Sequence, residues 1–250
     1  MKIVSIRDIH IGEGIPKVIV PLIGKNLDEL LAEMKIIKQA GPDIVEWRVD
    51  VLEEVENLEI VKKTLSTIRK TLFPIPLLFT FRSSREGGNK EIEDTYYTKL
   101  LKEVIQTKEI DLVDVELFSS DVIEIVATAK TYNVFVVMSN HDFEKTPVKE
   151  EIIWRLRRMQ ELGAHIPKIA VMPKLPTDVL TLLDATYTMH SLYADRPIIT
   201  MSMTSTGVIS RLVGEVFGSA ATFGAGMEAS APGQIPASNL KEILEVLHNN

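Results

Sequence analysis

Lys168 is the residue whose surroundings most directly suggest chemistry. It lies in the segment Ile166–Lys174, "IPKIAVMPK", whose apolar residues are typical of a fully buried strand. An ammonium group without a partner is costly to bury, and a buried lysine therefore tends to lose its proton. The neutral amine is a nucleophile that forms an imine with a ketone, and the protonated imine acidifies the neighbouring C–H bond. A lone buried lysine is more often ion-paired than catalytic, so the role of Lys168 has to be inferred from the residues expected around it.

Three further residues could assist such a lysine. His141 follows the apolar run "VFVVMSN", and its unperturbed pKa of about 6.5 lets it act as acid and base near neutral pH. Arg48 and Arg82 follow two other apolar runs, and as like charges they would lower the pKa of a nearby lysine. For each residue the alternative is a structural ion pair or a solvated position.

The alternation of side chains along strands brings these residues to one face. Glu46, Arg48 and Asp50 share a face of their strand, opposite Val45 and Trp47. The same alternation directs a further set inward: Thr80, Arg82, Asp114, Glu116, Ser139, His141, Lys168, Ala170 and Met172. A cavity lined by both charge signs predicts a small anionic, polyhydroxylated ligand. A structural ion pair is an equally good interpretation for Asp50 and Asp114.

Eight apolar, β-branched runs must position these side chains, and amphipathic segments separate them. This pattern predicts a (β/α)8 TIM barrel, preceded by a short N-terminal β-hairpin, as one domain over residues 1–250; an open doubly wound sheet is the alternative. Catalytic groups then gather at the carboxyl ends of the strands. The expected strands are Lys17–Gly24, Asp43–Asp50, Pro76–Ser83, Asp111–Phe118, Asn133–His141, Pro167–Pro173, Pro197–Met203 and Ser219–Gly224.

Helix signals support the same pattern. The segment "NLDELLAEMKIIKQA" carries its leucines, Met34 and Ile37 on one face. Side chains that can accept a hydrogen bond from a helix amide precede three segments, and glycines follow two. We therefore expect helix caps at Asn26, Ser119 and Thr146 and helix ends at Gly41 and Gly163.

Three segments that follow strands are candidates for the rim of the cavity. In "FRSSREGGNKE", Gly87 and Gly88 predict a turn that carries Arg82 and Glu86 over the barrel mouth. The segment "FGAGMEASAPGQIPAS" is long and rich in small residues, and it is predicted to be a mobile lid. Arg211 in "GVISRLVGEVFGS" is expected just inside a helix, where the helix N-terminus and a guanidinium can bind a carboxylate or phosphate. Solvated turns and a surface arginine are the alternatives.

Composition narrows the functional class. The chain has 250 residues, no cysteine, 45% hydrophobic residues and a net charge of -7. Disulfides, a thiolate nucleophile and a cysteine zinc site are excluded, and no basic run offers a phosphate footprint for nucleic acid. No signal-peptide core and no apolar run of about 18 residues is present, so we expect a cytoplasmic protein without membrane spans.

Six sequence blocks resemble one enzyme family. They are "EWRVD" at 46–50, "FTFRSSREGG" at 79–88, "SNHDFEKTP" at 139–147, "PKIAVMP" at 167–173, "SRLVGEVFGSAATFG" at 210–224 and "ASAPGQIP" at 229–236. Together they resemble the type I 3-dehydroquinate dehydratases of the shikimate pathway, from about residue 11 almost to the C-terminus. The resemblance implies a (β/α)8 barrel, commonly a homodimer, that dehydrates 3-dehydroquinate to 3-dehydroshikimate without a cofactor or metal.

The resemblance also implies roles for individual residues. Lys168 would form the imine with the C3 ketone, and His141 would take the C2 proton and later protonate the departing C1 hydroxyl. Glu86 would orient His141 and tune its basicity. Arg211 would bind the substrate carboxylate, and Glu46, Arg48 and Arg82 would bind its ring hydroxyls. Ser230 and Gln234 would close over the substrate from the lid. The apolar walls would be Phe143, Met201 and Met203. Some relatives carry a serine where this chain has Pro21, so we leave position 21 out of the site.

Three other functions remain open on the residues alone. A class I aldolase-type barrel acting on a phosphorylated sugar would share the buried lysine, but it does not need His141 paired with Glu86. A metal-dependent isomerase or lyase would use Glu46, Glu116 and His141 as ligands, although the sequence has no HxH or HExxH spacing. A barrel without catalytic activity would only bind a small acid.

Overall fold

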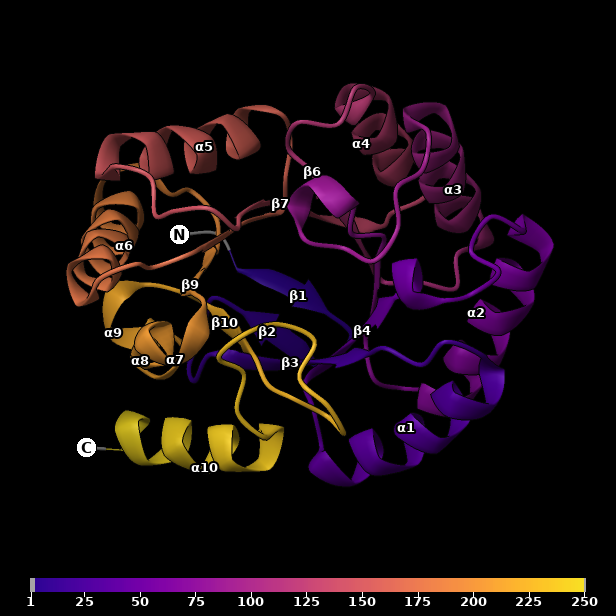
Figure 1. Cartoon of the computed structure of the whole chain (residues 1–250), viewed down its shortest axis with the longest axis horizontal. Helices are drawn as coiled ribbons and strands as arrows, with labels where there is room; N and C mark the ends of the chain where they lie inside the picture. Colours follow the sequence, from indigo (N-terminus) through magenta and orange to yellow (C-terminus); the bar gives the residue numbers. More distant parts are fainter. Residues whose placement is uncertain (1–2, 250) are drawn as a thin grey trace.

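The computed structural model describes residues 3–249, and its central element is an eight-stranded parallel sheet that curls into a barrel (Figure 1). The sheet order is β10-β3-β4-β5-β6-β7-β8-β9. A parallel bridge between Ile198 and Ser219 joins the two ends, next to a 2.8 Å hydrogen bond from the Ala220 amide to the Ile198 carbonyl. The prediction of a (β/α)8 barrel is confirmed, and the open doubly wound sheet is excluded. The barrel strands are β3 Lys17–Leu22, β4 Ile44–Arg48, β5 Leu77–Thr80, β6 Leu112–Glu116, β7 Phe135–Asp142, β8 Ile166–Val171, β9 Ile199–Ser202 and β10 Ala221–Phe223.

Helices follow the strands and form the outer layer seen in Figure 1. The long ones are α1 Leu27–Ala40, α2 Leu58–Leu72, α3 Asp94–Thr107, α4 Val122–Thr131, α5 Lys149–Glu161, α6 Pro176–Thr188 and α10 Ala237–His248. Shorter turns are η1 Val49–Val51, η2 Ser84–Glu86, η3 Met189–Tyr193, α7 Thr204–Gly207, α8 Ile209–Leu212 and α9 Gly214–Phe217. None of the helices in the described part of the chain has the length and apolarity that crossing a membrane requires.

The helix α1 shows how local sequence sets the element boundaries. The Asn26 side chain accepts a hydrogen bond from the Glu29 amide at the N-terminus, and Gly41 ends the helix with φ of 60°. The predicted caps at Ser119 and Thr146 are wrong, because α4 follows Asp121 and α5 follows Val148. These two hydroxyls instead donate to backbone carbonyls at the ends of β6 and β8, which are better placed acceptors than helix amides are donors.

Two apolar layers hold the barrel together. The larger lies between strands and helices and contains residues such as Trp47, Phe79 and Met138. The smaller fills the barrel interior with side chains such as Ile44 and Leu78, and it extends to the cavity through Met201 and Phe223. Removal of this apolar surface from water is the main force that keeps the strands closed on each other.

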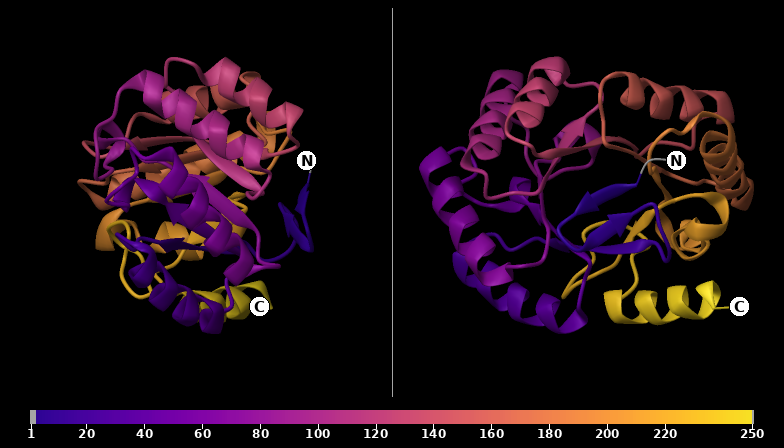
Figure 2. Two further views of the ribbon diagram at one scale, coloured as in Figure 1. Left: turned by 90° about the vertical axis from the view of Figure 1, so that its right-hand side faces the viewer. Right: turned by 180° about the vertical axis from the view of Figure 1, so that it is seen from behind.

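The N-terminal hairpin seals one end of this interior. Strands β1 (Val4–Ile6) and β2 (Ile9–Ile11) pair antiparallel, as predicted, and Ile6 and Ile11 join the interior layer. Figure 2 shows the hairpin at one end of the barrel and the segment between β10 and α10 at the other. The cavity can therefore open only at the carboxyl ends of the strands, where the predicted polar residues gather.

Candidate active site

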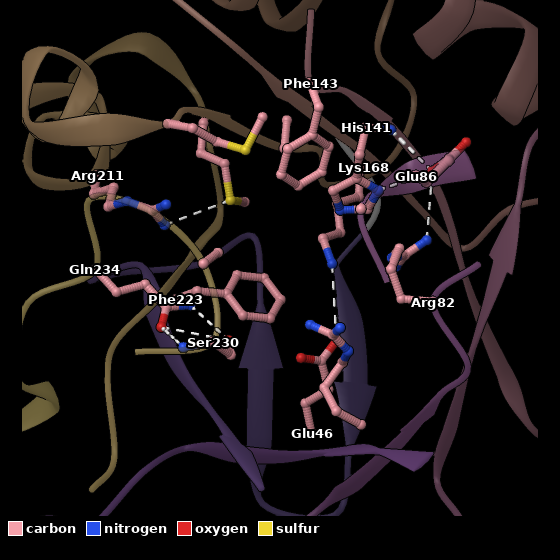
Figure 3. Close-up of a pocket in the computed structure, with 16 residues that line it drawn as sticks. Glu46, Arg82, Glu86, His141, Phe143, Lys168, Arg211, Phe223, Ser230 and Gln234 are labelled. Carbon is pink, nitrogen blue, oxygen red and sulfur yellow. Dashed lines mark hydrogen bonds and ion pairs between the residues drawn. The ribbon is translucent and has the colours of Figure 1, made fainter. Parts of the chain in front are cut away.

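A cavity of about 500 Å³, which includes its mouth, lies at the carboxyl ends of the barrel strands (Figure 3). Every residue that the sequence proposed as catalytic or substrate-binding lines it: Glu46, Arg48, Arg82, Glu86, His141, Lys168, Arg211, Ser230 and Gln234. The predicted apolar walls Phe143, Met201 and Met203 also line it, and Pro21 does not. Alternation correctly placed the members of this set that lie on strands, Glu46, Arg48, His141 and Lys168, because the strands stay regular up to the level of the cavity.

Sheet register puts Lys168 near the centre of the cavity. Lys168 pairs in register with Ser139 on β7 and Ile199 on β9, and its side chain points into the barrel. Its Nζ lies 3.6 Å from Asp114 Oδ2 and 3.9 Å from Glu46 Oε1. On the opposite side it lies 4.3 Å from the centroid of the Phe223 ring.

Burial decides the protonation of this lysine. Lys168 is 3% exposed, and burial lowers its pKa below the ordinary value. Glu46 and Asp114 act in the opposite direction and favour the ammonium, whereas Arg82 and Arg48 support the lowering. The sequence had predicted the effect of the two arginines but not the opposing carboxylates. The net result is an amine that is easier to deprotonate than a surface lysine.

His141 and Glu86 form the pair that the sequence predicted. His141 Nδ1 lies 2.9 Å from Glu86 Oε2, and the same oxygen accepts the His141 backbone N–H at 3.0 Å. Glu86 Oε1 accepts from Asn140 Nδ2 at 3.0 Å. A carboxylate surrounded by donors fits an imidazole that donates Nδ1–H, and this tautomer leaves the lone pair of Nε2 to act as a base.

Burial shifts the acidities of both partners toward their uncharged forms. It raises the pKa of Glu86 to about 8, although Arg82 works against this shift. Burial also lowers the pKa of His141 well below its usual value, and Arg82, Lys168 and Arg48 add to this effect. His141 is therefore a neutral base at physiological pH, rather than the half-protonated group that an unperturbed imidazole would be.

The turn after β5 is shaped so that Glu86 faces His141. Gly87 ends η2 with φ of 82°, a conformation that favours glycine. A Cβ at Gly88 would lie 1.8 Å from the Arg82 carbonyl oxygen, so a side chain there would force the turn open. The two glycines of "REGG" thus do what the sequence predicted, and the Phe143 ring packs directly over Gly87.

Arg82 is the centre of a buried ionic network. Its Nη1 donates to Glu116 Oε1 and Ser139 Oγ, both at 2.9 Å, and its Nη2 lies 2.9 Å from Asp114 Oδ1. Burial opposes its charge, but Asp114 and Glu116 outweigh this and hold the pKa of Arg82 well above its usual value. The sequence had assigned Arg82 to ring hydroxyls; in the structure its Nη1 already donates to protein oxygens, and its Nη2 is ion-paired with Asp114.

Arg48 is similarly neutralised. It makes two hydrogen bonds to Asp50, at 2.8 and 2.9 Å. Asp50 lies in η1 rather than in the strand, and it also accepts the backbone N–H of Asn89 at 3.2 Å. The structural ion pair, one of the two interpretations of Asp50, is therefore the one that the structure has, while Arg48 still lines the cavity. Glu46 remains directed at Lys168 and accepts from Thr80 Oγ1 at 2.9 Å.

Arg211 is held differently from the other two arginines. It is 1% exposed, yet no residue in the range 3–249 offers it a carboxylate, and burial lowers its pKa to about 10. Its donors reach only the Pro232 carbonyl oxygen, at 3.2 Å, and the Met201 thioether, at 3.6 Å, while Nε has no partner. A buried guanidinium in this state is a strong binding site for an anion.

Arg211 lies just inside a helix, as expected, but this helix is very short. The segment after β9 is divided into α7, α8 and α9, each of four residues, and Arg211 is the third residue of α8. Such short turns contribute little dipole, so the guanidinium itself must provide the attraction for an anion.

The segment between β10 and α10 lies across the cavity mouth. Ser230 and Gln234 hydrogen-bond to each other, with the Ser230 amide 2.9 Å from Gln234 Oε1, and both side chains line the cavity (Figure 3). The Pro232 carbonyl accepts the Thr204 amide at 3.2 Å, which joins this segment to α7. The position agrees with a lid, whereas its mobility stays a prediction.

Two residues near the site were missed by the sequence. Phe223 ends β10 on the inward face and lines the cavity, which continued alternation from Ala221 would have indicated. Asn140 contacts Glu86 although it has the parity of Val136 and Met138, whose side chains pack on the helices. The sequence did contain a signal for this contact, because Asn140 is a single polar residue among the helix-facing positions of a buried strand.

The metal-site alternative finds no support in this geometry. Within residues 3–249 no group of three or more His, Asp or Glu side chains is arranged to hold a metal ion. Glu116, one of the proposed ligands, instead accepts hydrogen bonds from Arg82 and from the amide and hydroxyl of Ser83.

Comparison with known proteins identifies the family of the chain. Residues 18–250 match the family model described as Type I 3-dehydroquinase. The chain is 60% identical over 252 residues to a 3-dehydroquinate dehydratase of Bacillus subtilis (strain 168), covering 100% of this chain and 99% of the relative. It is 56% identical to a crystallised type I 3-dehydroquinate dehydratase of Clostridium difficile with covalent modified comenic acid, with a TM-score of 0.97 and coverage of 99% and 98%. A 3-deoxy-D-arabino-heptulosonate 7-phosphate synthase of Thermotoga maritima, in truncated form, shares only the fold, at 11% identity and a TM-score of 0.62, with coverage of 99% and 91%.

Proposed function

The chain belongs to the type I 3-dehydroquinase family, and from this premise we propose that it dehydrates 3-dehydroquinate through an imine on Lys168. It is a hydro-lyase, a 3-dehydroquinate dehydratase. What the residues add is a division of roles: an amine for the ketone, a base for the proton, and an unpaired guanidinium for the carboxylate. The observation that carries the proposal is that Lys168, His141 and Arg211 face one cavity.

The first step forms the covalent link. The neutral Lys168 amine attacks the C3 carbonyl carbon, and one amine proton passes to the carbonyl oxygen. This oxygen takes a second proton from solvent and leaves as water, so that a protonated imine remains; the later hydrolysis returns the solvent proton. The lowered pKa of Lys168 supplies the neutral amine, and burial is its main cause. Glu46 and Asp114, at 3.9 and 3.6 Å, then stabilise the positive charge of the imine nitrogen.

Proton transfer by His141 completes the elimination. Its Nε2 takes the C2 proton, and the C–H electrons move toward the imine carbon to give an enamine. The enamine electrons then expel the C1 hydroxyl, which takes the proton from the imidazolium and leaves as water. Hydrolysis of the imine releases 3-dehydroshikimate and restores the Lys168 amine. In its ionised form, Glu86 accepts Nδ1–H and stabilises the imidazolium while it exists.

Substrate recognition is assigned to the other side chains of the cavity. Arg211 grips the carboxylate, because it is buried without an anionic partner. Ring hydroxyls bind to the polar side chains opposite, and the segment after β10 covers the ring. The residues proposed for these contacts are Glu46, Arg48, Arg82, Ser230 and Gln234, with Phe143, Met201 and Met203 as apolar walls.

The proposal extends to the setting of the enzyme. We propose one catalytic domain over residues 1–250, a homodimer in the cytoplasm, and a reaction that needs no cofactor because the imine itself is the electron sink. The substrate is a small molecule; the net charge of -7 offers no attraction for nucleic acid.

Borohydride reduction during turnover tests the imine directly. Reduction in the presence of 3-dehydroquinate should add the mass of the reduced ligand to the peptide that contains Lys168. Lys168→Ala should remove both the adduct and turnover, because no amine then reaches the ketone. Lys174→Ala is the matched control, since Lys174 is exposed just after the same strand and should keep both. Retained turnover in Lys168→Ala would contradict the proposal.

A further inference from the structure

A line of hydrogen bonds connects the helix α5 to the imidazole of His141. Arg155 Nη1 on α5 donates to Asn140 Oδ1 at 2.7 Å, and Asn140 Nδ2 donates to Glu86 Oε1 at 3.0 Å. Glu86 Oε2 then meets His141 Nδ1 at 2.9 Å. The first two residues of this line lie outside the cavity, and the mechanism derived above does not use them.

The Asn140 amide is held in one orientation by its two neighbours. A guanidinium can only donate, so the amide oxygen must face Arg155 and the NH2 group must face the carboxylate of Glu86. Turning the amide over would place two donors together on one side and two acceptors together on the other. Arg155 is itself fixed by Glu151 at 2.9 Å and lies 3.6 Å from Asp142.

Asn140 has no direct access to a substrate. It is 4% exposed and lies on the helix-facing side of β7, between His141 and Ser139, which face the barrel interior. Any effect on the reaction must therefore pass through Glu86. A buried polar group in this place is costly unless it does something that an apolar residue cannot, since Val136 and Met138 fill the equivalent positions of the strand.

We propose that Asn140, locked by Arg155, is a positioning residue that occupies Glu86 Oε1 and thereby reserves Oε2 for His141 Nδ1. The inference rests on the proposed function of His141 as the base. The bond also stabilises the ionised carboxylate, because Asn140 offers N–H to its oxygen and lowers the pKa of Glu86 against the larger effect of burial, which raises it.

Several other charged groups act on Glu86 and must be kept constant in a test. Arg82 lies 3.4 Å away and favours the ionised form, whereas Glu116 and Asp114 on β6 disfavour it. On β7 the neighbouring titratable group is His141 itself. Within η2, Arg85 is directed outward to Asp94. None of these residues is changed by a substitution at Asn140 or Arg155.

The test is the pH profile of kcat for Asn140→Leu, which has a similar size but no donor. Without the donor the pKa of Glu86 rises, and a protonated Glu86 no longer has the negative charge that stabilises the imidazolium of His141. Activity is lost as the pH falls through the pKa of Glu86, so the acid limb of the profile should move to higher pH by about one unit. At neutral pH we expect kcat to fall about 10-fold with KM nearly unchanged, because Asn140 does not touch the substrate.

Variants of Arg155 separate positioning from packing. Arg155→Met releases the amide and should move the acid limb in the same direction by a smaller amount. Arg158→Met is the control, since Arg158 lies on the same helix, is exposed and pairs with Glu161. Nitrogen-15 spectra of His141 should show Nδ1 protonated in the unmodified enzyme and a mixture of tautomers in Arg155→Met.

Borohydride trapping makes the two proposals separately testable. Adduct formation in the unmodified enzyme together with an unchanged acid limb in Asn140→Leu and Arg155→Met would overturn the positioning role while the imine mechanism stands. Absence of the adduct in the unmodified enzyme would overturn the proposed function instead. If Asn140→Leu fails to fold, Asn140→Ser and Arg155→Met decide the question by the same profile.

Discussion

Arg82 and Arg211 are both buried arginines of one cavity, but among the described residues only Arg82 has carboxylate partners. On the side of β4 to β8, Arg82 is surrounded by Asp114, Glu116 and Glu86, and its pKa is raised well above the usual value. On the side of β9 and β10, the hydrogen-bond acceptors that Arg211 meets among residues 3–249 are a carbonyl oxygen and a thioether, and burial lowers its pKa to about 10. Figure 3 shows the two groups on opposite sides of Lys168.

This difference assigns Arg82 to the structure of the cavity and Arg211 to substrate binding. A buried charge that already has counter-charges contributes to a fixed geometry and has little attraction left for a ligand. A buried charge without a counter-charge makes the empty protein less stable and binds an anion strongly, because the ligand supplies what is missing. The catalytic base lies on the first side, where a fixed geometry matters most for proton transfer.

The largest expected effect is on the catalytic side, at the base itself. His141→Ala should lower kcat by about 100- to 10,000-fold, because no other neutral base lies in the cavity at this position. Steady-state kinetics measure the loss, and borohydride trapping should still detect an imine. His10→Ala, in the exposed part of the hairpin, should have the kinetics of the unmodified enzyme. An unchanged rate for His141→Ala would show that another group takes the proton.

Stability tests the scaffold role of Arg82. Arg82→Met leaves Asp114 and Glu116 buried without their counter-charge, and the free energy of unfolding should fall by about 3–5 kcal/mol. Urea denaturation followed by circular dichroism measures this change. A free energy of unfolding equal to that of the unmodified protein would mean that the network is not what holds this side of the cavity.

For Arg211 we expect no loss of stability, in contrast to Arg82. This is the smallest change expected for the protein without substrate. Arg211→Met removes an unpaired charge, so the free energy of unfolding should stay the same or rise by about 1 kcal/mol. KM should nevertheless rise by about 100-fold, since the charge-assisted contact to the carboxylate is lost. An unaltered KM would argue against the carboxylate contact, and a large loss of stability would remove the contrast with Arg82.

Much of the architecture could be predicted from local patterns. Each of the eight predicted strands overlaps a barrel strand, and most observed strands are shorter, as for Asp43–Asp50 against β4. The exceptions are the end of β7, which lies one residue later than predicted, and the start of β8, which lies one residue earlier. Strand alternation depends only on neighbouring residues, and it brought Glu46, His141 and Lys168 to the same cavity. Local patterns failed in two respects. They predicted helix caps at Ser119 and Thr146, and they did not predict the division of the helix around Arg211, because tertiary contacts override local signals there.

The sequence by itself determined which strand side chains could face the cavity, since a period of two leaves each strand residue only two faces. Only the tertiary structure decided how these charges are shared: that Arg82 belongs to the carboxylates, that Arg211 has none, and that Asn140 connects α5 to Glu86. The reason is physical. Electrostatic and hydrogen-bonding partners are selected by distances of a few ångströms between residues far apart in the chain, and closure of the barrel fixes those distances.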